Sequence, residues 1–296
     1  MGSVTVALYG GLGNQMFQYA MGRALALRHN VALKLDIYGF EFDTYYKRHF
    51  ELGHFSIPHQ LTKVRKPIVF HVSRAMRRLS YSRKLFSCLL RPWLLIESGR
   101  EYDPQMRIIN AANDVFVMGY WQDERYFLEF RDEIRGEFVL ADSLSAANRK
   151  LAAQISSSPN PVAVHVRRLH EVPSTPNGKL NGNSQQNGRS LGRDYYVLAT
   201  KELSTYVKNP AFFVFSDYPK WSRENIGFDG ATTYLENDRG PDHEDMILMS
   251  LCHHHVIANS SFSWWGAWLA NYPGQVAITP RMTSYMPNVP ARWLRM

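Results

Sequence analysis

The feature that most constrains the fold is a series of short β-rich segments that end in polar residues and alternate with helix-type stretches. In the first half, "VTVALYG" (4–10) precedes apolar residues at helical spacing, and "VALKLDI" (31–37) follows them. A strand, a helix and a second strand in this order predict a βαβ unit within a parallel, doubly wound sheet. The fold class predicted is therefore α/β.

The second half repeats this pattern after a Ser/Pro-rich stretch, "SSSPNP" (156–161), which we interpret as a linker. Its predicted strands are "VAVHVRR" (162–168), "AFFVFSD" (211–217), "HHHVIAN" (253–259) and "QVAITP" (275–280). The chain is thus predicted to form two Rossmann-like domains, residues 1–157 and 158–296. A ligand is expected in a cleft between them, at the carboxyl ends of the strands.

Composition limits the protein class. The 296 residues suffice for two cores, and two distant cysteines, Cys88 and Cys252, predict no disulfide framework. The N-terminus lacks a basic and apolar signal pattern, and the most apolar stretches are too short to span a bilayer. We therefore expect a soluble, cytoplasmic protein.

Positive charge is concentrated in one segment. Every charged residue between Leu52 and Ile96 is lysine or arginine, and the chain carries a formal net charge of +8. This basic segment, 60–96, leans toward helix and could be a solvated face, or could contact an anionic membrane or lipid-linked glycan from the cytoplasmic side. Nucleic acid is not an expected partner because no nucleic-acid motif accompanies the charge.

The glycine-rich turn after the first predicted strand leaves its ligand open. Gly11 and Gly13 have the G-x-G spacing of a dinucleotide fingerprint, but Met16 occupies the third glycine position. With Asp36 as a ribose ligand, this turn would support the alternative of a nicotinamide-dependent oxidoreductase. Asn14 and Gln15 would lie near a helix N-terminus, where an anion or sugar can bind, although Asn14 could also be a simple N-cap.

The predicted strand ends carry side chains suited to a phosphate rather than to a metal. Arg167 and Arg168 follow one strand, and guanidinium groups grip phosphate oxygens bidentately. The sequence holds no Asp-x-Asp pair, and consecutive histidines at 253–255 would point to opposite faces of a strand. No metal site is predicted.

Four blocks of sequence together resemble the α-1,2-fucosyltransferases of glycosyltransferase family 11. They are "GGLGNQMFQYA" (10–20), "GYWQDERYF" (119–127), "HVRR" (165–168) and "EDMILMSLCHHHVIANSSFSWWGAWL" (244–269). The blocks occur in the family's order, so the resemblance covers most of the chain. The three tryptophans in the last block make it the most specific, although Trp265 and Trp268 could serve packing alone.

The resemblance implies a GT-B-like fold with the acceptor on the N-terminal domain and the donor, GDP-β-L-fucose, on the C-terminal one. It implies inversion to an α-1,2 linkage on a galactose-terminated acceptor, with neither metal nor cofactor. Arg167 matches the arginine that grips the pyrophosphate, Arg168 stands beside it, and Asp245 matches the acid that reads guanine. The remaining donor-binding positions are Gly13, Asn14, Gln15, His165, Asp217, Asn259, Ser260, Ser261 and Phe262.

The chain departs from the family directly after the arginine pair. Leu169 and His170 stand where Gly-Asp is usual, so His170 or Glu171 would have to supply a base, or the reaction would proceed without one. His170 is the candidate catalytic base, within a polar loop (170–193) whose role is open. A catalytically impaired GDP-sugar-binding protein is the further alternative.

Overall fold

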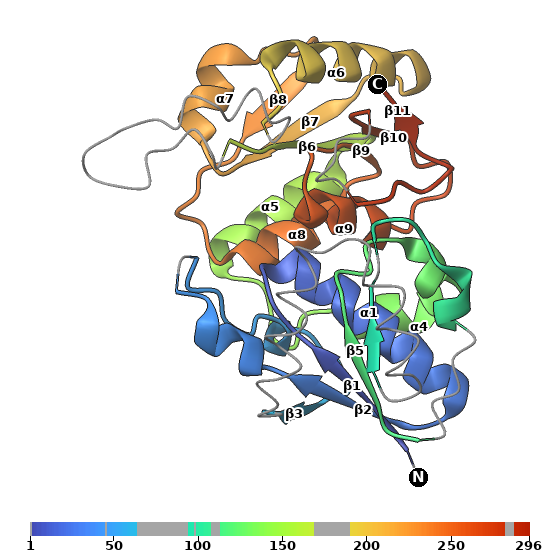
Figure 1. Ribbon diagram of the computed structural model, residues 1–296. Coiled ribbons are helices and arrows are strands. Elements are labelled where there is room, and N and C mark those ends of the chain that lie inside the picture. Colours follow the sequence, from blue (N-terminus) through green and yellow to red (C-terminus); the bar gives the residue numbers. More distant parts are fainter. Residues whose placement is uncertain are drawn as a thin grey trace. The chain divides into compact units, whose positions relative to one another are not determined.

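The computed structural model describes residues 2–44, 46–63, 94–97, 99–107, 113–168, 190–281 and 287–296. The chain divides into two compact units, Met1–Ala141 and Asp142–Met296. Each unit is a parallel α/β sheet with helices packed on it (Figure 1). The predicted α/β class with two Rossmann-like domains is confirmed.

The first unit has a five-stranded parallel sheet in the order β3-β2-β1-β5-β4. The strands are β1 Ser3–Ala7, β2 Ala32–Asp36, β3 Gln60–Thr62, β4 Leu94–Ile96 and β5 Val115–Met118. The helices are α1 Leu12–His29 and α4 Arg131–Glu137, with short 3-10 turns η1 Tyr38–Phe42, η2 Leu52–His54, η3 Pro104–Arg107, η4 Glu124–Tyr126 and η5 Leu128–Phe130. The order β1, α1, β2 confirms the predicted βαβ start.

The turn from β1 into α1 depends on Gly10 rather than on Gly11 or Gly13. Gly10 has φ +81°, a left-handed conformation that side-chain-bearing residues rarely adopt, whereas Gly11 is the extended N-cap of α1. Gly13 and Asn14 already lie within the helix. Asn14 is therefore not the N-cap.

The segment after β5 is only partly helical, although Phe127, Phe130 and Ile134 recur at the spacing of a helix. Two 3-10 turns precede α4, which spans only Arg131–Glu137. The Glu97 carboxylate accepts hydrogen bonds from the backbone N–H groups of Tyr120 (2.6 Å) and Trp121 (2.9 Å), and Trp121 has φ +55°. These bonds fix the chain direction before a regular helix can begin.

The second unit has a six-stranded parallel sheet in the order β11-β10-β9-β6-β7-β8. The strands are β6 Pro161–Val166, β7 Ala211–Ser216, β8 Ala231–Tyr234, β9 His254–Val256, β10 Ala277–Thr279 and β11 Leu294–Arg295. The helices are α5 Ala146–Ser157, α6 Arg193–Tyr206, α7 Pro219–Asn225, α8 Asp242–Leu251 and α9 Ser261–Leu269. Numbered from β6, the order is the Rossmann order 3-2-1-4-5-6.

Helices cover both faces of this second sheet (Figure 1). Val162, Val164 and Val166 of β6 belong to the core cluster under α6, whereas Ala163 joins the cluster with α5 and α8. The alternation of side chains along a strand explains this division. A strand buried on both faces reads as the continuous apolar run seen in the sequence.

Helix α5 belongs to the second unit, whereas the sequence-based division placed it in the first, before a boundary at 157/158. Its buried Leu151 and Ile155 share a core with Leu248 and Met249 of α8. The predicted linker 156–161 is instead the end of α5 and the start of β6, joined by a short turn. The serines that suggested a linker only end a helix.

The assignment of α5 predicts the effect of truncating its buried face. Ile155→Ala is expected to destabilise the protein by roughly 2–5 kcal/mol, because Ile155 is fully buried and the lost contacts leave a cavity. Urea unfolding of the full chain measures this, with the exposed Lys150→Ala on the same helix as the control. An Ile155→Ala midpoint equal to that of the control would contradict the packing.

Most of the basic segment, residues 64–93, lies outside the described part of the chain. Its two ends form the edge strands β3 and β4 of the first sheet. Among the described residues, none of the helices has the length and apolar character needed to cross a bilayer.

Candidate functional site

The strand order of the second sheet identifies where a ligand should bind. The order reverses beside β6, because β7 and β8 follow on one side and β9 to β11 on the other. At such a switch point the connections leave in opposite directions and open a crevice at the carboxyl ends of the strands. Here that edge is formed by the residues after Val166, Ser216 and Val256.

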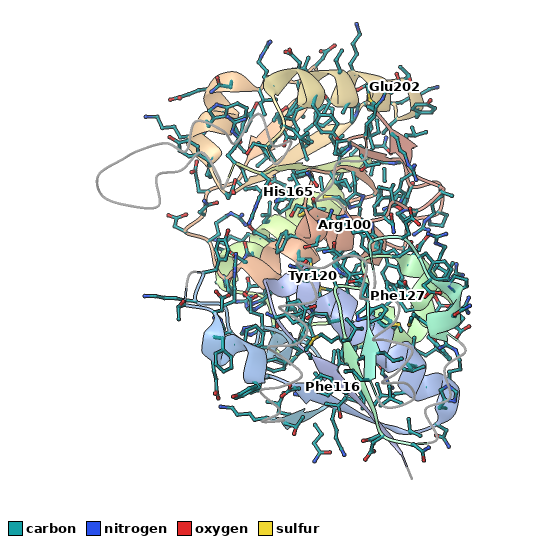
Figure 2. All side chains as sticks on the ribbon, viewed as in Figure 1. Arg100, Phe116, Tyr120, Phe127, His165 and Glu202 are labelled. Atoms are coloured by element: carbon teal, nitrogen blue, oxygen red, sulfur yellow. The ribbon has the colours of Figure 1, made fainter. Side chains whose placement is uncertain are left out.

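A pocket of about 170 Å³ lies at this edge. Its lining combines five predicted site residues, His165, Arg167, Asp217, Asp245 and Phe262. Figure 2 labels His165 on β6. The further lining residues are Phe215, Ser216, Glu236, Asn237, Arg239, Gly240 and Asp242.

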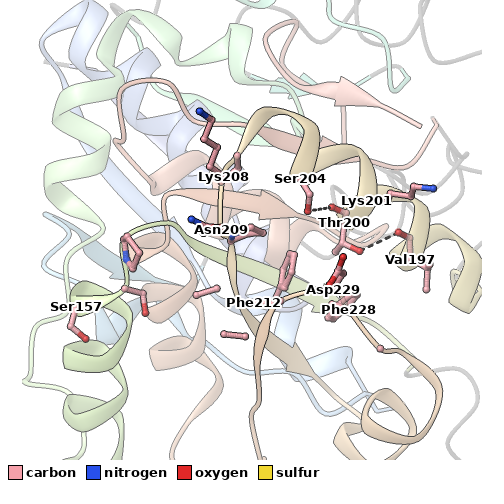
Figure 3. A pocket seen from close by; sticks show the side chains of 18 residues that line it. Ser157, Val197, Thr200, Lys201, Ser204, Lys208, Asn209, Phe212, Phe228 and Asp229 are labelled. Carbon is pink, nitrogen blue, oxygen red and sulfur yellow. Dashed lines mark hydrogen bonds between the residues drawn. The ribbon is translucent and has the colours of Figure 1, made fainter.

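A larger pocket of about 980 Å³ lies at the opposite edge of the same sheet, where β6, β7 and β8 begin (Figure 3). Its lining is mainly small and hydroxyl side chains with Phe212 and Phe228, and its charged groups, Lys201, Lys208 and Asp229, are exposed. Ligands of doubly wound sheets bind at the carboxyl edge. We therefore assign the smaller, charged pocket as the candidate site.

The register of β6 and β7 brings Arg167 and Asp217 together. Val166 pairs with Ser216, so the next residue of each strand leaves the sheet at the same level. Arg167 Nε lies 3.5 Å from Asp217 Oδ2, and the other carboxylate oxygen accepts a hydrogen bond from the Arg168 N–H at 2.7 Å. The carboxylate thus holds both the Arg167 side chain and the backbone beyond β6.

Arg168 does not contribute to the pocket, although the sequence analysis placed it beside Arg167 as a second phosphate ligand. Its guanidinium carbon lies 3.7 Å from the ring centre of Trp221, and Nη1 donates to the Leu191 carbonyl at 3.1 Å. Neighbouring residues at a strand end project to opposite sides. Arg168 therefore packs against α7 and the chain before α6, and of these two arginines only Arg167 lines the pocket.

His165 lines the pocket as an uncharged side chain. Its ring lies 5.7 Å from that of Phe262, and the side chain is buried. Burial, and secondarily the charge of Arg167, lowers the pKa of His165 to about 3. An imidazole with this pKa stays uncharged at neutral pH and is a weak proton acceptor.

Asp245 lies in the first turn of α8 and forms an ion pair with Arg239, with Nη2 and Oδ1 separated by 2.9 Å. Burial raises the pKa of Asp245, an effect that Arg239 opposes. Arg239 belongs to the segment between β8 and α8. Arg239, Glu236 and Asn237 are not recognisable as site residues from the sequence, because this segment has no motif of its own.

Of the predicted donor residues that follow β9, only Phe262, in the first turn of α9, lines the pocket. Ser260 is the N-cap of α9 and accepts a hydrogen bond from the Phe262 N–H at 3.3 Å. Asn259 and Ser261 are partly buried on either side of this cap. Their predicted donor contacts stay a prediction.

The N-terminal candidates lie in the other unit, on α1. Gln15 is buried, and its amide joins two segments by donating to the carbonyls of Gly10 and His49 and accepting from the Glu51 N–H, each at 2.9 Å. Asn14 accepts a hydrogen bond from Gln122 at 2.8 Å. Gln15 therefore supports the turn, and Asn14 is the more exposed of the two.

Three further predictions concern other residues. The base candidates His170 and Glu171 lie outside the described residues, as does the loop up to 189. The described residues contain no group of three or more His, Cys, Asp or Glu side chains placed to hold a metal. His254 and His255 instead bond Val276, Met249 and Gln275.

Three buried histidines predict a stability that depends on pH. Burial lowers the pKa of His165 to about 3 and of His254 and His255 to about 4. In the unfolded chain the histidines have pKa values near 6.5 and become protonated below that pH, whereas in the folded protein they stay neutral. Because the unfolded chain binds more protons, the free energy of unfolding falls as the pH drops below about 6.5. We expect a loss of about 2 kcal/mol for each histidine between pH 7 and pH 5.

Urea unfolding at these two pH values measures the effect. His255→Gln is the matched variant, because it removes one titrating group. It should reduce the difference in the free energy of unfolding between pH 7 and pH 5 by the contribution of one histidine, whatever the stability of the variant at pH 7. A free energy of unfolding that is equal at pH 5 and pH 7 would contradict the neutral, buried state of these side chains.

Comparison with known proteins identifies relatives over the full length. The model of glycosyl transferase family 11 matches residues 3–285. An α-1,2-colitosyltransferase of Escherichia coli is 32% identical over 100% of this chain and 99% of its own. The O-antigen biosynthesis glycosyltransferase WbnK of Escherichia coli is 30% identical over 93% of this chain and 92% of its own.

More distant matches agree with these. A mouse galactoside α-(1,2)-fucosyltransferase 2 is 27% identical over 91% of this chain and 69% of its own. The crystal structure of fucosyltransferase NodZ from Bradyrhizobium superposes with a TM-score of 0.50 and 15% identity, covering 90% of this chain and 92% of that chain. That likeness shows the shared GT-B-like fold.

Proposed function

Since the chain belongs to glycosyl transferase family 11, we propose that it moves a 6-deoxy-L-galactose-type sugar from a GDP donor to the 2-hydroxyl of a terminal galactose. L-Fucose is the donor sugar that the sequence analysis predicts. The match to this family sets aside the nicotinamide-dependent oxidoreductase that Gly11, Gly13 and Asp36 left open. The reaction proposed inverts the donor configuration and uses no metal.

The observation that carries the proposal is the pocket with a cation at one strand end and a carboxylate at the start of a helix. Arg167, directly after β6, and Asp245, on α8, both line it. A nucleoside diphosphate sugar offers the complementary groups, because its pyrophosphate is anionic and a guanine edge donates hydrogen bonds. Arg167 and Asp245 therefore favour different parts of one donor.

The α8 end suits guanine and disfavours phosphate. Its first turn carries Asp242, Glu244 and Asp245, and negative charges there would repel a pyrophosphate. Guanine presents N1–H and the 2-amino group side by side, and one carboxylate accepts from both. Adenine lacks this pair of donors. Asp245 is therefore our candidate for base recognition.

The Arg167 end suits the pyrophosphate. Phe262, in the first turn of α9, lines the pocket, and that first turn has no acidic residue. Backbone N–H groups at a helix N-terminus and a guanidinium both stabilise an anion. Charge grows on the β-phosphate as its bond to the sugar breaks, so these donors act mainly in the transition state.

Inversion requires the galactose 2-hydroxyl to attack the sugar carbon from the side opposite GDP, and its proton must then leave. His165 is unsuited to accept that proton because burial lowers its pKa to about 3. We propose His170 for this role, because a neutral imidazole can accept the proton of a hydroxyl group.

The donor sugar and the acceptor define the test. Colitose is L-fucose without its 3-hydroxyl, and the E. coli relative named for it makes GDP-colitose the competing donor. The protein is mixed with GDP-fucose or GDP-colitose, EDTA and a panel of β-galactosides, and the products are weighed by mass spectrometry. Addition of one sugar to a terminal galactose supports the proposal, and the donor ratio decides between the two sugars.

Two outcomes argue against a metal-independent transferase. Product that forms only without EDTA would refute metal independence. Tight GDP binding without product from either donor would favour the catalytically impaired binding protein, which the replacement of Gly-Asp by Leu169 and His170 allows.

Arg167→Ala is predicted to lower kcat by roughly 10²–10³-fold, because the variant loses a charge that stabilises the departing pyrophosphate. Arg167→Lys should recover part of the rate, since an ammonium keeps the charge but not the planar fork. Steady-state kinetics measure both, with the exposed Lys220→Ala as the control. Near-native turnover of Arg167→Ala would refute the role of this arginine.

We also propose that the acceptor is a bacterial surface glycan carried on lipid, and that the basic segment 60–96 meets the membrane surface. The names of the E. coli relatives and the cluster of positive charge support this. Charge reversal at Arg74, Arg77 and Arg78 should then lower activity on a lipid-linked acceptor and spare a short soluble one. If the charge-reversed variant keeps the same fraction of wild-type activity on both acceptors, the proposed membrane contact is contradicted.

A further inference from the structure

We propose that Arg239 is a positioning residue that holds the Asp245 carboxylate in place to read guanine, and that α5 anchors it. The inference rests on the proposed function, because it concerns how the same pocket selects its nucleotide. It assigns to the segment between β8 and α8 a part in donor specificity that the sequence analysis did not identify.

All three guanidinium nitrogens of Arg239 donate hydrogen bonds. Nη2 donates to Asp245 Oδ1 at 2.9 Å, Nη1 to Asn148 Oδ1 at 2.7 Å, and Nε to the Glu236 carbonyl at 2.7 Å. The side chain is 16% exposed, so solvent competes little with these bonds. A planar guanidinium that is hydrogen-bonded through all three nitrogens has a fixed orientation. Its hydrogen bond to Asp245 therefore also restricts the orientation of that carboxylate.

Asn148 gives this arginine a rigid support. It is fully buried in α5, and its Nδ2 donates to Glu244 Oε2 at 2.6 Å. The same Glu244 carboxylate accepts from the backbone and hydroxyl of Ser145, the N-cap of α5. Glu244 and Asp245 are neighbours on α8, so the network links the base-reading helix to α5 at two adjacent residues.

Gly240 lets the segment approach this network closely. A Cβ at position 240 would lie 3.0 Å from Asn148 Nδ2 and 3.2 Å from Glu244 Oε2. A side chain at position 240 would therefore crowd Asn148 and Glu244, the two residues that support Arg239.

Arg239 also favours the charged form of Asp245. Burial raises the pKa of Asp245, the carboxylates of Asp242 and Glu244 on α8 raise it further, and Arg239 opposes both effects. A protonated carboxyl group donates one hydrogen bond and cannot accept from both guanine groups. Loss of Arg239 should thus impair guanine binding through the orientation of the carboxylate and through its charge.

The alternative role for Arg239 is direct contact with the donor phosphates, since it also lines the pocket. The two roles predict changes in different ligand preferences. A positioning residue changes the preference for guanine over adenine, whereas a phosphate ligand changes the preference for a diphosphate over a monophosphate.

Calorimetric titration of the full chain with GDP, GMP and ADP separates these roles. The variants are Arg239→Gln, Asn148→Ala and the control Arg223→Gln, which removes a neighbouring exposed arginine paired with Glu236. We expect Arg239→Gln to weaken GDP binding by at least tenfold, to leave ADP binding unchanged, and to preserve the GDP-to-GMP ratio. Asn148→Ala should act in the same sense with a smaller effect, and the control should match the wild type.

A pH series adds a second measure. The affinity of the wild type for GDP should fall on acidification as Asp245 becomes protonated, and in Arg239→Gln this fall should begin at a higher pH. Three results for Arg239→Gln would overturn the inference. They are an equal loss of GDP and ADP affinity, a reduced ratio of GDP affinity to GMP affinity, and an unchanged preference for GDP over ADP. Wild-type protein that binds ADP as well as GDP would instead refute the proposed function.

Discussion

The candidate site depends on the parallel pairing of β6 with β7. Their register sets Val166 opposite Ser216, so Arg167 and Asp217 leave the sheet side by side. A shift of one residue would turn every side chain of β6 to the other face and would remove Arg167 from the pocket. The register is favoured by the different side chains on the two faces of β6, because a slipped strand would turn the valines that pack against α6 toward α5 and α8.

The two helices that meet the pocket divide its chemistry by their charge. The first turn of α8 carries three acids, whereas that of α9 carries none. Acidic side chains are stable at a helix N-terminus because they complement the helix dipole, but they close that end to phosphate. We therefore propose that guanine binds beside the first turn of α8 and the pyrophosphate beside the first turn of α9.

The sequence predicts the strands that are buried on both faces, because continuous apolar runs mark β6 and β7 clearly. It does not predict β8, "ATTY", whose residues are partly exposed and carry no such run. The end of α5 was interpreted as a linker because Ser156–Ser158 look like loop residues, and only packing against α8 shows otherwise. Tertiary contacts, which a single sequence does not reveal, decide both cases.

The same limit applies within the site. Arg167 follows from its place at a strand end, but its neighbour Arg168 cannot face the same way, and its partner Trp221 is distant in the sequence. Asp245 was found through a resemblance rather than from a pattern of charges. The Arg239–Asn148 contact joins residues 91 positions apart and has no local signal.

The decisive measurement is a crystal structure of the protein with GDP. We expect the guanine N1 and 2-amino groups within hydrogen-bonding distance of the Asp245 carboxylate, with the β-phosphate on Arg167 and the N-terminus of α9. A GDP molecule bound elsewhere, or bound in this pocket with its phosphates toward α8, would contradict it.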